Sequence, residues 1–175
     1  MQFRTAEIDD LHKLVALYKA VARQEGGIAR LEHEVTEDYV KDFLIKSLAS
    51  GLIIVGEHPE DPERLVAEMH GYKAGPKIFD HVLGEITVLV DPEFQGKKVG
   101  KTLMMIFLDE IVRNRTDIGK VELFTSEGNH RAMALYQSLG FRIEGRFEMR
   151  IRTPDKNYEA DIPMGWQNPN FEFEF

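Results

Sequence analysis

The sequence predicts a mixed α/β (α+β) fold in which a mostly antiparallel sheet is flanked by helices. Two observations lead to this fold class. Short apolar runs bounded by turn residues alternate with longer segments whose apolar residues recur every three or four positions, as in amphipathic helices. Their order is one strand, two helices, three strands, and then helix, strand, helix and two strands. A meander followed by a strand–helix–strand–helix unit implies a mixed sheet covered by helices.

Each expected element rests on a local signal. Thr36 can cap the second helix, with Val35 and Val40 placed around it as a hydrophobic staple, and Gly51 can stop that helix. In chain order we expect a strand at 2–6, a helix from Asp9 or Asp10 to Gly26-Gly27, a helix between Thr36 and Gly51, strands at 52–55, 65–74 and 82–90, a helix at 99–115, a strand at 121–125, a helix at 131–139, and strands at 141–151 and 158–164.

The length of 175 residues suits one compact domain, which we place at residues 1–167, followed by a C-terminal arm at 168–175. The end of the arm, residues 171–175, alternates Phe and Glu. This alternation fits an edge strand or a homodimer contact, and an arm folded back on its own domain is an equal alternative.

Composition excludes several classes of site. There are no cysteines, and the six histidines lack metal-ligand spacing, so we expect no disulfide and no metal. No apolar run approaches the ~20 residues that span a membrane, and the first residues lack the features of a signal peptide, so we expect no membrane contact and a cytoplasmic location. The net charge of −8 argues against a nucleic-acid partner and suits an amine substrate, although it also simply keeps a protein soluble.

The most informative segment runs from Val88 to Thr102, where an apolar strand turns into a helix through glycines and lysines. A helix N-terminus exposes unpaired N–H groups and the positive end of its dipole, so it binds phosphate well. Gly96 and Gly100 allow close approach of an anion to the backbone. Three lysines add positive charge: Lys97, Lys98 and Lys101.

A nucleotide-binding P-loop is the rival interpretation, because Gly96 to Thr102 reads G-x-x-x-G-K-T. The spacing is one residue short of that motif. The acidic pair Asp109-Glu110 lies in the same predicted helix, so it cannot reach the loop as a magnesium ligand would. We therefore do not favour an NTPase.

Two segments resemble the GNAT superfamily of N-acetyltransferases. Gln95 and Gly100 match the ends of its acetyl-CoA signature Q/R-x-x-G-x-G/A, while Lys98 stands where the middle glycine is usual. Residues 129–141 match every named position of its block N-x-x-A-x-x-L-Y-x-x-L-G-F. The resemblance covers nearly the whole chain and implies a GNAT-like acyl-CoA N-acyltransferase fold.

The resemblance also implies roles for residues. A main-chain N–H near Leu89 would face the thioester oxygen, and Tyr136 would be the general acid, although it could instead only pack its helix on the sheet. Asn129 would contact CoA, but it is also a good helix N-cap. The implied cofactor contacts are Val88, Leu89, Val90, Gln95, Gly96, Lys97, Lys98, Val99, Gly100, Lys101 and Asn129.

The base is less well defined by the sequence. Glu85 lies where phosphinothricin-type acetyltransferases carry a glutamate, so the resemblance implies that it is the base. On a regular strand it shares a face with Thr87 and Leu89. The equal alternative is that Glu85 is a solvated charge that points outward. Glu34 is a weaker candidate for binding the substrate cation. We expect direct transfer of an acetyl group from acetyl-CoA to a primary amine of a small molecule, without metal. The alternatives are a peptide or protein N-terminus as acceptor, and a non-catalytic domain that senses acyl-CoA.

Overall fold

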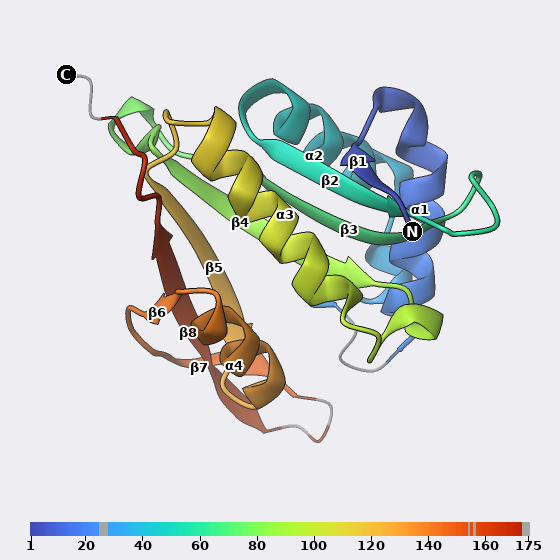
Figure 1. The fold of residues 1–175 in the computed structure, drawn as a ribbon. Coiled ribbons are helices and arrows are strands. Elements are labelled where there is room, and N and C mark those ends of the chain that lie inside the picture. The colour runs from blue at the N-terminus through green and yellow to red at the C-terminus, as the bar shows by residue number, and fades with distance from the viewer. Residues whose placement is uncertain (25–27, 154, 156, 173–175) are drawn as a thin grey trace. The chain divides into compact units, whose positions relative to one another are not determined.

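The computed structural model describes residues 1–24, 28–153, 155 and 157–172. The chain divides into two compact units, Met1–Lys73 with Thr87–Glu110 and Ala74–Ile86 with Ile111–Phe175 (Figure 1). Strand β4 and helix α3 each contribute residues to both units. The single domain at 1–167 therefore stays a prediction, and the expected helix end at Gly26-Gly27 lies outside the described residues.

The elements follow the predicted order, so the predicted mixed fold class is confirmed. Most of their ends lie within a few residues of the expected ones. Their bounds are β1 Phe3–Thr5, α1 Leu11–Ala22, α2 Glu37–Ser50, β2 Leu52–Glu57, β3 Leu65–Tyr72, β4 Val82–Val90, α3 Val99–Asn114, β5 Lys120–Ser126, α4 His130–Ser138, β6 Arg142–Ile143, β7 Phe147–Arg152 and β8 Tyr158–Gln167.

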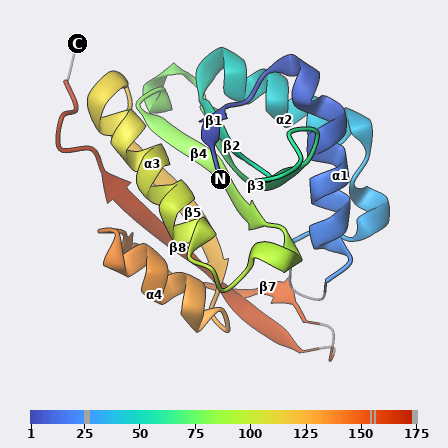
Figure 2. The same ribbon diagram turned by 45° about the vertical axis from the view of Figure 1, so that its right-hand side comes forward.

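In the first unit the strand order is β1-β2-β3-β4. Strand β2 pairs antiparallel with both β1 and β3. Helices α1 and α2 lie on one side of β2 and β3, and α3 lies on the other (Figures 1 and 2). Because α1 and α2 each have one apolar stripe, they bury it against the same sheet face. That core contains Ala6, Leu14, Leu17, Tyr18, Val21, Val35, Val40, Phe43, Leu44, Ile53, Val55, Leu65 and Leu89.

The signals predicted for α2 are confirmed at both ends. The Thr36 hydroxyl oxygen accepts the Tyr39 N–H at 3.1 Å, and Val35 and Val40 are both buried in the core beside it. At the other end, a Cβ on Gly51 would lie 1.9 Å from the carbonyl oxygen of Gly71. Only glycine therefore fits where α2 turns into β2.

In the second unit β4 pairs in parallel with β5 at Val82 and Leu83. Strand β5 pairs antiparallel with β8 over its whole length, and β6 and β7 also pair with β8. Helix α4 lies against β8 in both ribbon views (Figures 1 and 2). The packing agrees with this placement, because a Cβ added to Gly140, just after α4, would lie 3.4 Å from the ring of Trp166 in β8.

The single strand predicted at 141–151 is wrong. The chain forms two separate strands there, β6 and β7. In β7, Phe147 pairs with Asp161 but Ile151 pairs with Glu159, so four residues of β7 span two of β8. Met149 has φ +54°, a conformation that an apolar run does not signal and that accommodates the extra residues as a bulge.

The first residues of the C-terminal arm contact the second unit. The Asn168 side chain donates to the carbonyl oxygen of Ile118 at 2.9 Å, and the Asn168 N–H donates to that of Gly119 at 3.0 Å. The Phe171 ring lies beside Gly119. Residues 168–172 form no strand, which favours the arm folded back over the edge strand in this part, while the end of the alternation at 173–175 lies outside the described residues.

Candidate active site

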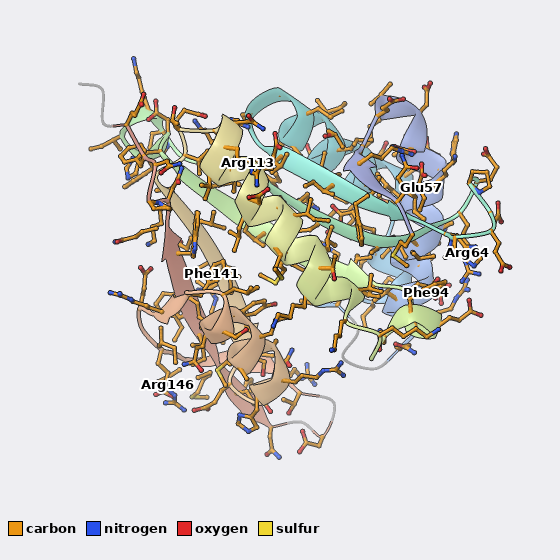
Figure 3. All side chains as sticks on the ribbon, in the orientation of Figure 1. Glu57, Arg64, Phe94, Arg113, Phe141 and Arg146 are labelled. Carbon is orange, nitrogen blue, oxygen red and sulfur yellow. The ribbon has the colours of Figure 1, made fainter. Side chains whose placement is uncertain are left out.

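The predicted phosphate loop begins where β4 ends, and a buried aspartate fixes its start. The Asp91 N–H donates to the carbonyl oxygen of Val66 at 2.8 Å, and the Asp91 carboxylate accepts the Glu93 N–H at 3.0 Å. Arg64 donates to Asp91 at 2.8 Å and to Glu93 at 2.7 Å. Figure 3 shows Arg64 and Phe94 at the same end of this unit. No local pattern points to Arg64, because its partners lie 27 or more residues away in the chain.

The loop itself holds two residues in the left-handed region. Gly96 has φ +76°, and Lys98 has φ +65°. Lys98 occupies the position where the acetyl-CoA signature usually has glycine, so the turn is kept although the residue is not glycine. A non-glycine residue there costs about 1–2 kcal/mol. Such strain persists only where the surroundings fix it, and it is found mostly at functional sites.

The charge around the loop suits an anion. Lys97, Lys98 and Lys101 are exposed, and none of them has a carboxylate within ion-pair distance in the described part of the chain. The ammonium group of Lys97 lies 5.0 Å from the centre of the Phe94 ring. Helix α3 begins at Val99, so its free N–H groups and its positive dipole end add to the same potential.

Two further loop residues have defined positions. The Gln95 side chain donates to the carbonyl oxygen of Val90 at 3.1 Å, which closes the turn. A Cβ added to Gly100 would lie 3.4 Å from Val90 Cγ2 and meet no other atom within 4 Å. Glycine is thus not required for packing at position 100, and a larger side chain would have to extend away from Val90.

The strand before the loop is only partly buried where it meets the loop. Leu89 is buried in the α1–α2 core, while Val88 and Val90 are half-buried. In the first unit β4 is the hydrogen-bonded neighbour of β3.

Glu85 lies in the part of β4 that belongs to the second unit. It is exposed and has φ +53°, so the regular alternation that the sequence predicted through 85, 87 and 89 is interrupted here. The position lies two residues beyond Leu83, the last residue of β4 that pairs with β5. Its role as a base stays a prediction.

Tyr136 and Asn129 lie at the two ends of α4, also in the second unit. Asn129 is the N-cap, with its side-chain oxygen accepting the Ala132 N–H at 3.1 Å. The Tyr136 ring centre lies 5.9 Å from that of Phe141, and burial raises the pKa of Tyr136. Its hydroxyl has no hydrogen-bond partner among the described residues. Tyr136 therefore packs on Phe141, and Asn129 caps its helix, as the two alternatives required. Packing does not use the Tyr136 hydroxyl, and capping does not use the Asn129 amide nitrogen.

The predicted site residues divide between the two units. The loop residues and Val88–Val90 belong to the first, whereas Glu85, Asn129 and Tyr136 belong to the second. Glu34, the weaker candidate, is exposed in a short 3-10 helix of the first unit, where its carboxylate accepts the N–H of Leu31 at 2.8 Å.

Sequence reasoning missed a buried polar network in the first unit. The Tyr18 hydroxyl donates to Glu68 at 2.7 Å and lies 3.2 Å from Nδ1 of His70, which is itself 2.9 Å from Glu68. Phe43 stacks on the His70 ring at 4.1 Å. Alternating polar residues in an apolar strand are the one signal that could have pointed to Glu68 and His70.

Two classes of feature are absent from the described residues. No group of three or more His, Asp or Glu side chains there is arranged to hold a metal ion. None of the described helices is both long and apolar enough to cross a bilayer.

Known proteins match both the sequence and the fold. A model of the Acetyltransferase (GNAT) family matches residues 14–141. Over 92 residues the chain is 37% identical to a mycothiol acetyltransferase of Kocuria rhizophila, a match that covers 51% of this chain and 29% of that protein. It is 30% identical over 95 residues to a spermidine N(1)-acetyltransferase of Escherichia coli, covering 50% of each. The matches thus span half or less of these curated relatives.

Solved structures match over nearly the full chain. The ribosomal-protein-alanine N-acetyltransferase of Brucella melitensis superposes with a TM-score of 0.80 at 21% identity, covering 95% of this chain and 99% of that one. The structure of yncA from Salmonella typhimurium with its cofactor acetyl-CoA superposes with a TM-score of 0.83 at 18% identity. That match covers 100% of this chain and 98% of that one. At such identities the likeness establishes the fold. Since the family model matches well over half of the residues, the chain belongs to the GNAT family of acetyltransferases.

Proposed function

We propose that this GNAT protein transfers the acetyl group of acetyl-CoA directly to a primary amine of a small molecule. The observation that carries the proposal is the loop Gln95–Lys101. Three exposed lysines without carboxylate partners among the described residues stand at the start of α3, in a protein of net charge −8. A concentrated positive charge beside free backbone N–H groups fits a pyrophosphate.

The chain supplies groups for each chemical need of the reaction. When bound, acetyl-CoA supplies an activated acetyl group, held as a thioester. A main-chain N–H near Leu89 is the proposed donor to the thioester oxygen, and such donors contribute about 3 kcal/mol in acyl transfer. The amine attacks as its neutral form, a C–N bond forms, and the C–S bond breaks. The proposed base Glu85 takes, directly or through water, the proton that the nitrogen loses. Tyr136 donates a proton to the departing thiolate.

The state of Tyr136 agrees with this role. Burial raises its pKa above the ordinary value of 10.0, so the hydroxyl is protonated throughout the neutral range. A thiolate whose conjugate acid has a pKa of about 8.5 can still take that proton while leaving. Asn129 holds the start of α4 through its side-chain oxygen, which leaves its amide nitrogen available to the proposed CoA contact.

Calorimetric titration with acetyl-CoA tests the first half of the proposal, and thiol release against a panel of amines tests the second. We expect binding in the micromolar range and release of CoA that depends on both the protein and an amine. Titration with desulfo-CoA is the control for the thioester. Binding without release for any amine or peptide would identify an acyl-CoA sensor. Release only with peptide N-termini would identify a protein acetyltransferase instead.

A further inference from the structure

One face of the β5–β8–β7 sheet in the second unit carries side chains that the reaction above does not use. Phe124 pairs with Pro163 across the β5–β8 ladder, and Phe147 pairs with Asp161 across the β7–β8 ladder. Partners in an antiparallel pair share a face, as do residues two apart, so Phe124, Phe147 and Asp161 lie on the same side. The two phenylalanine ring centres are 6.0 Å apart, and each residue is 43% exposed.

Arg150 lies across these two rings. Its Cζ atom is 5.2 Å from the centre of the Phe124 ring and 5.0 Å from that of Phe147. The bulge at Met149, with φ +54°, sets the position of Arg150 next to it. A guanidinium stacked on aromatic faces keeps the N–H donors along its edge, and these match a carboxylate in two-point contact.

Asp161 provides the opposite charge. Its carboxylate lies 3.3 Å from Nε of Arg150, and its side chain is 12% exposed. Among the described residues it is the carboxylate that pairs with Arg150. Burial raises the pKa of Asp161, and the Arg150 charge offsets part of that effect. A carboxylate so little exposed is stabilised by any further cation that reaches it.

We propose that the face formed by Phe124, Phe147, Arg150 and Asp161 binds the acceptor, and that the acceptor is a free amino acid with an apolar side chain. Arg150 binds its carboxylate, and the two rings contact its side chain. Asp161 binds its α-amino group, which arrives as an ammonium ion and loses a proton before it attacks. This inference rests on the proposed function and names its substrate class.

Charge complementarity decides between acceptor classes. An α-amino acid carries both charges one carbon apart, so it can satisfy an Arg–Asp pair at both ends. A polyamine such as spermidine would bring a second ammonium group against Arg150, which costs affinity because like charges repel. The N-terminus of a peptide has the amine but no adjacent carboxylate, so Arg150 would gain no anionic partner.

The test compares kcat/KM for L-phenylalanine, L-phenylalanine amide, phenethylamine and spermidine in the thiol-release assay. We expect L-phenylalanine to be used at least about tenfold better than the other three, since a charge-assisted contact is lost with the carboxylate. Arg150→Gln should lower kcat/KM for L-phenylalanine at least about tenfold, mostly through KM. The matched control is Arg152→Gln, which removes one exposed positive charge from the same strand and should change the value less than about twofold.

Direct titration of L-phenylalanine into the protein with CoA present separates this inference from the proposed function. Binding that Arg150→Gln weakens, without thiol release, would refute acetyl transfer and leave the amino-acid site standing. The inference is overturned if L-phenylalanine does not bind, if the amide or phenethylamine is used equally well, or if the Arg150 and Arg152 variants behave alike.

Discussion

The buried network of the first unit gives a sharp prediction on stability. Tyr18→Phe removes one hydroxyl and leaves the ring in place. The centre of that ring lies 5.0 Å from the ring centre of Phe43 and 6.1 Å from that of Tyr39. The hydroxyl donates to Glu68 at 2.7 Å and lies 3.2 Å from His70 Nδ1. Tyr18 and Glu68 are each 0% exposed, so water cannot replace the lost bond.

The expected loss follows from the type of bond. Burial and the negative charge of Glu68 raise the pKa of Tyr18 well above its ordinary value, so the hydroxyl keeps its proton and donates. A hydrogen bond to a charged group contributes about 1.5–3 kcal/mol, and the carboxylate left with one donor fewer stays buried. We therefore expect the free energy of unfolding to fall by about 2–3 kcal/mol.

Urea denaturation measures this loss as a shift in the midpoint at an unchanged m-value. The matched control is Tyr158→Phe, which removes a hydroxyl from a tyrosine that is 57% exposed. That variant should lie within about 0.5 kcal/mol of the parent protein. A loss below about 0.5 kcal/mol for Tyr18→Phe, or equal losses for both variants, would refute the reasoning.

Other predictions concern the loop, the reaction and pH. Gly100→Val should reduce acetyl-CoA affinity at least about tenfold by titration with the melting temperature nearly unchanged, because the added atoms extend toward the anion rather than the core. Tyr136→Phe should keep that affinity and lower kcat about ten- to a thousandfold; an unchanged kcat would leave Tyr136 a packing role. Glu85→Gln should lower kcat while the affinity for acetyl-CoA stays near that of the parent protein, and an unchanged kcat would exclude Glu85 as the base. Burial tends to raise the pKa of Asp10, but its bonds to Arg4 outweigh that effect and lower the pKa below 3.8. The contribution of Asp10 to the free energy of unfolding is thus present above that value and is lost as pH falls below it. Asp10→Asn should therefore make the free energy of unfolding depend less on pH in acid.

Local signals in the sequence determined the order of the elements and the position of the loop. The capping signals Thr36, Val35 and Val40 act within about one turn of helix. The glycines and lysines of the loop all lie in the seven-residue segment Gln95–Lys101. Interactions this short depend little on the rest of the chain, so pattern and spacing suffice to predict them. The family motifs added Tyr136 and Asn129, whose exact contacts the pattern left open.

Only the tertiary structure decided the features that depend on register between distant segments. Tyr18 meets Glu68 across 50 residues, and Arg150 lies over Phe124 because β7 and β5 both pair with β8. The left-handed conformations at Lys98 and Met149 had no signal either, since lysine and methionine rarely adopt them. The backbone conformation at such positions is unfavourable by itself and is stabilised by the residues packed around it. A pattern along the sequence does not describe that packing.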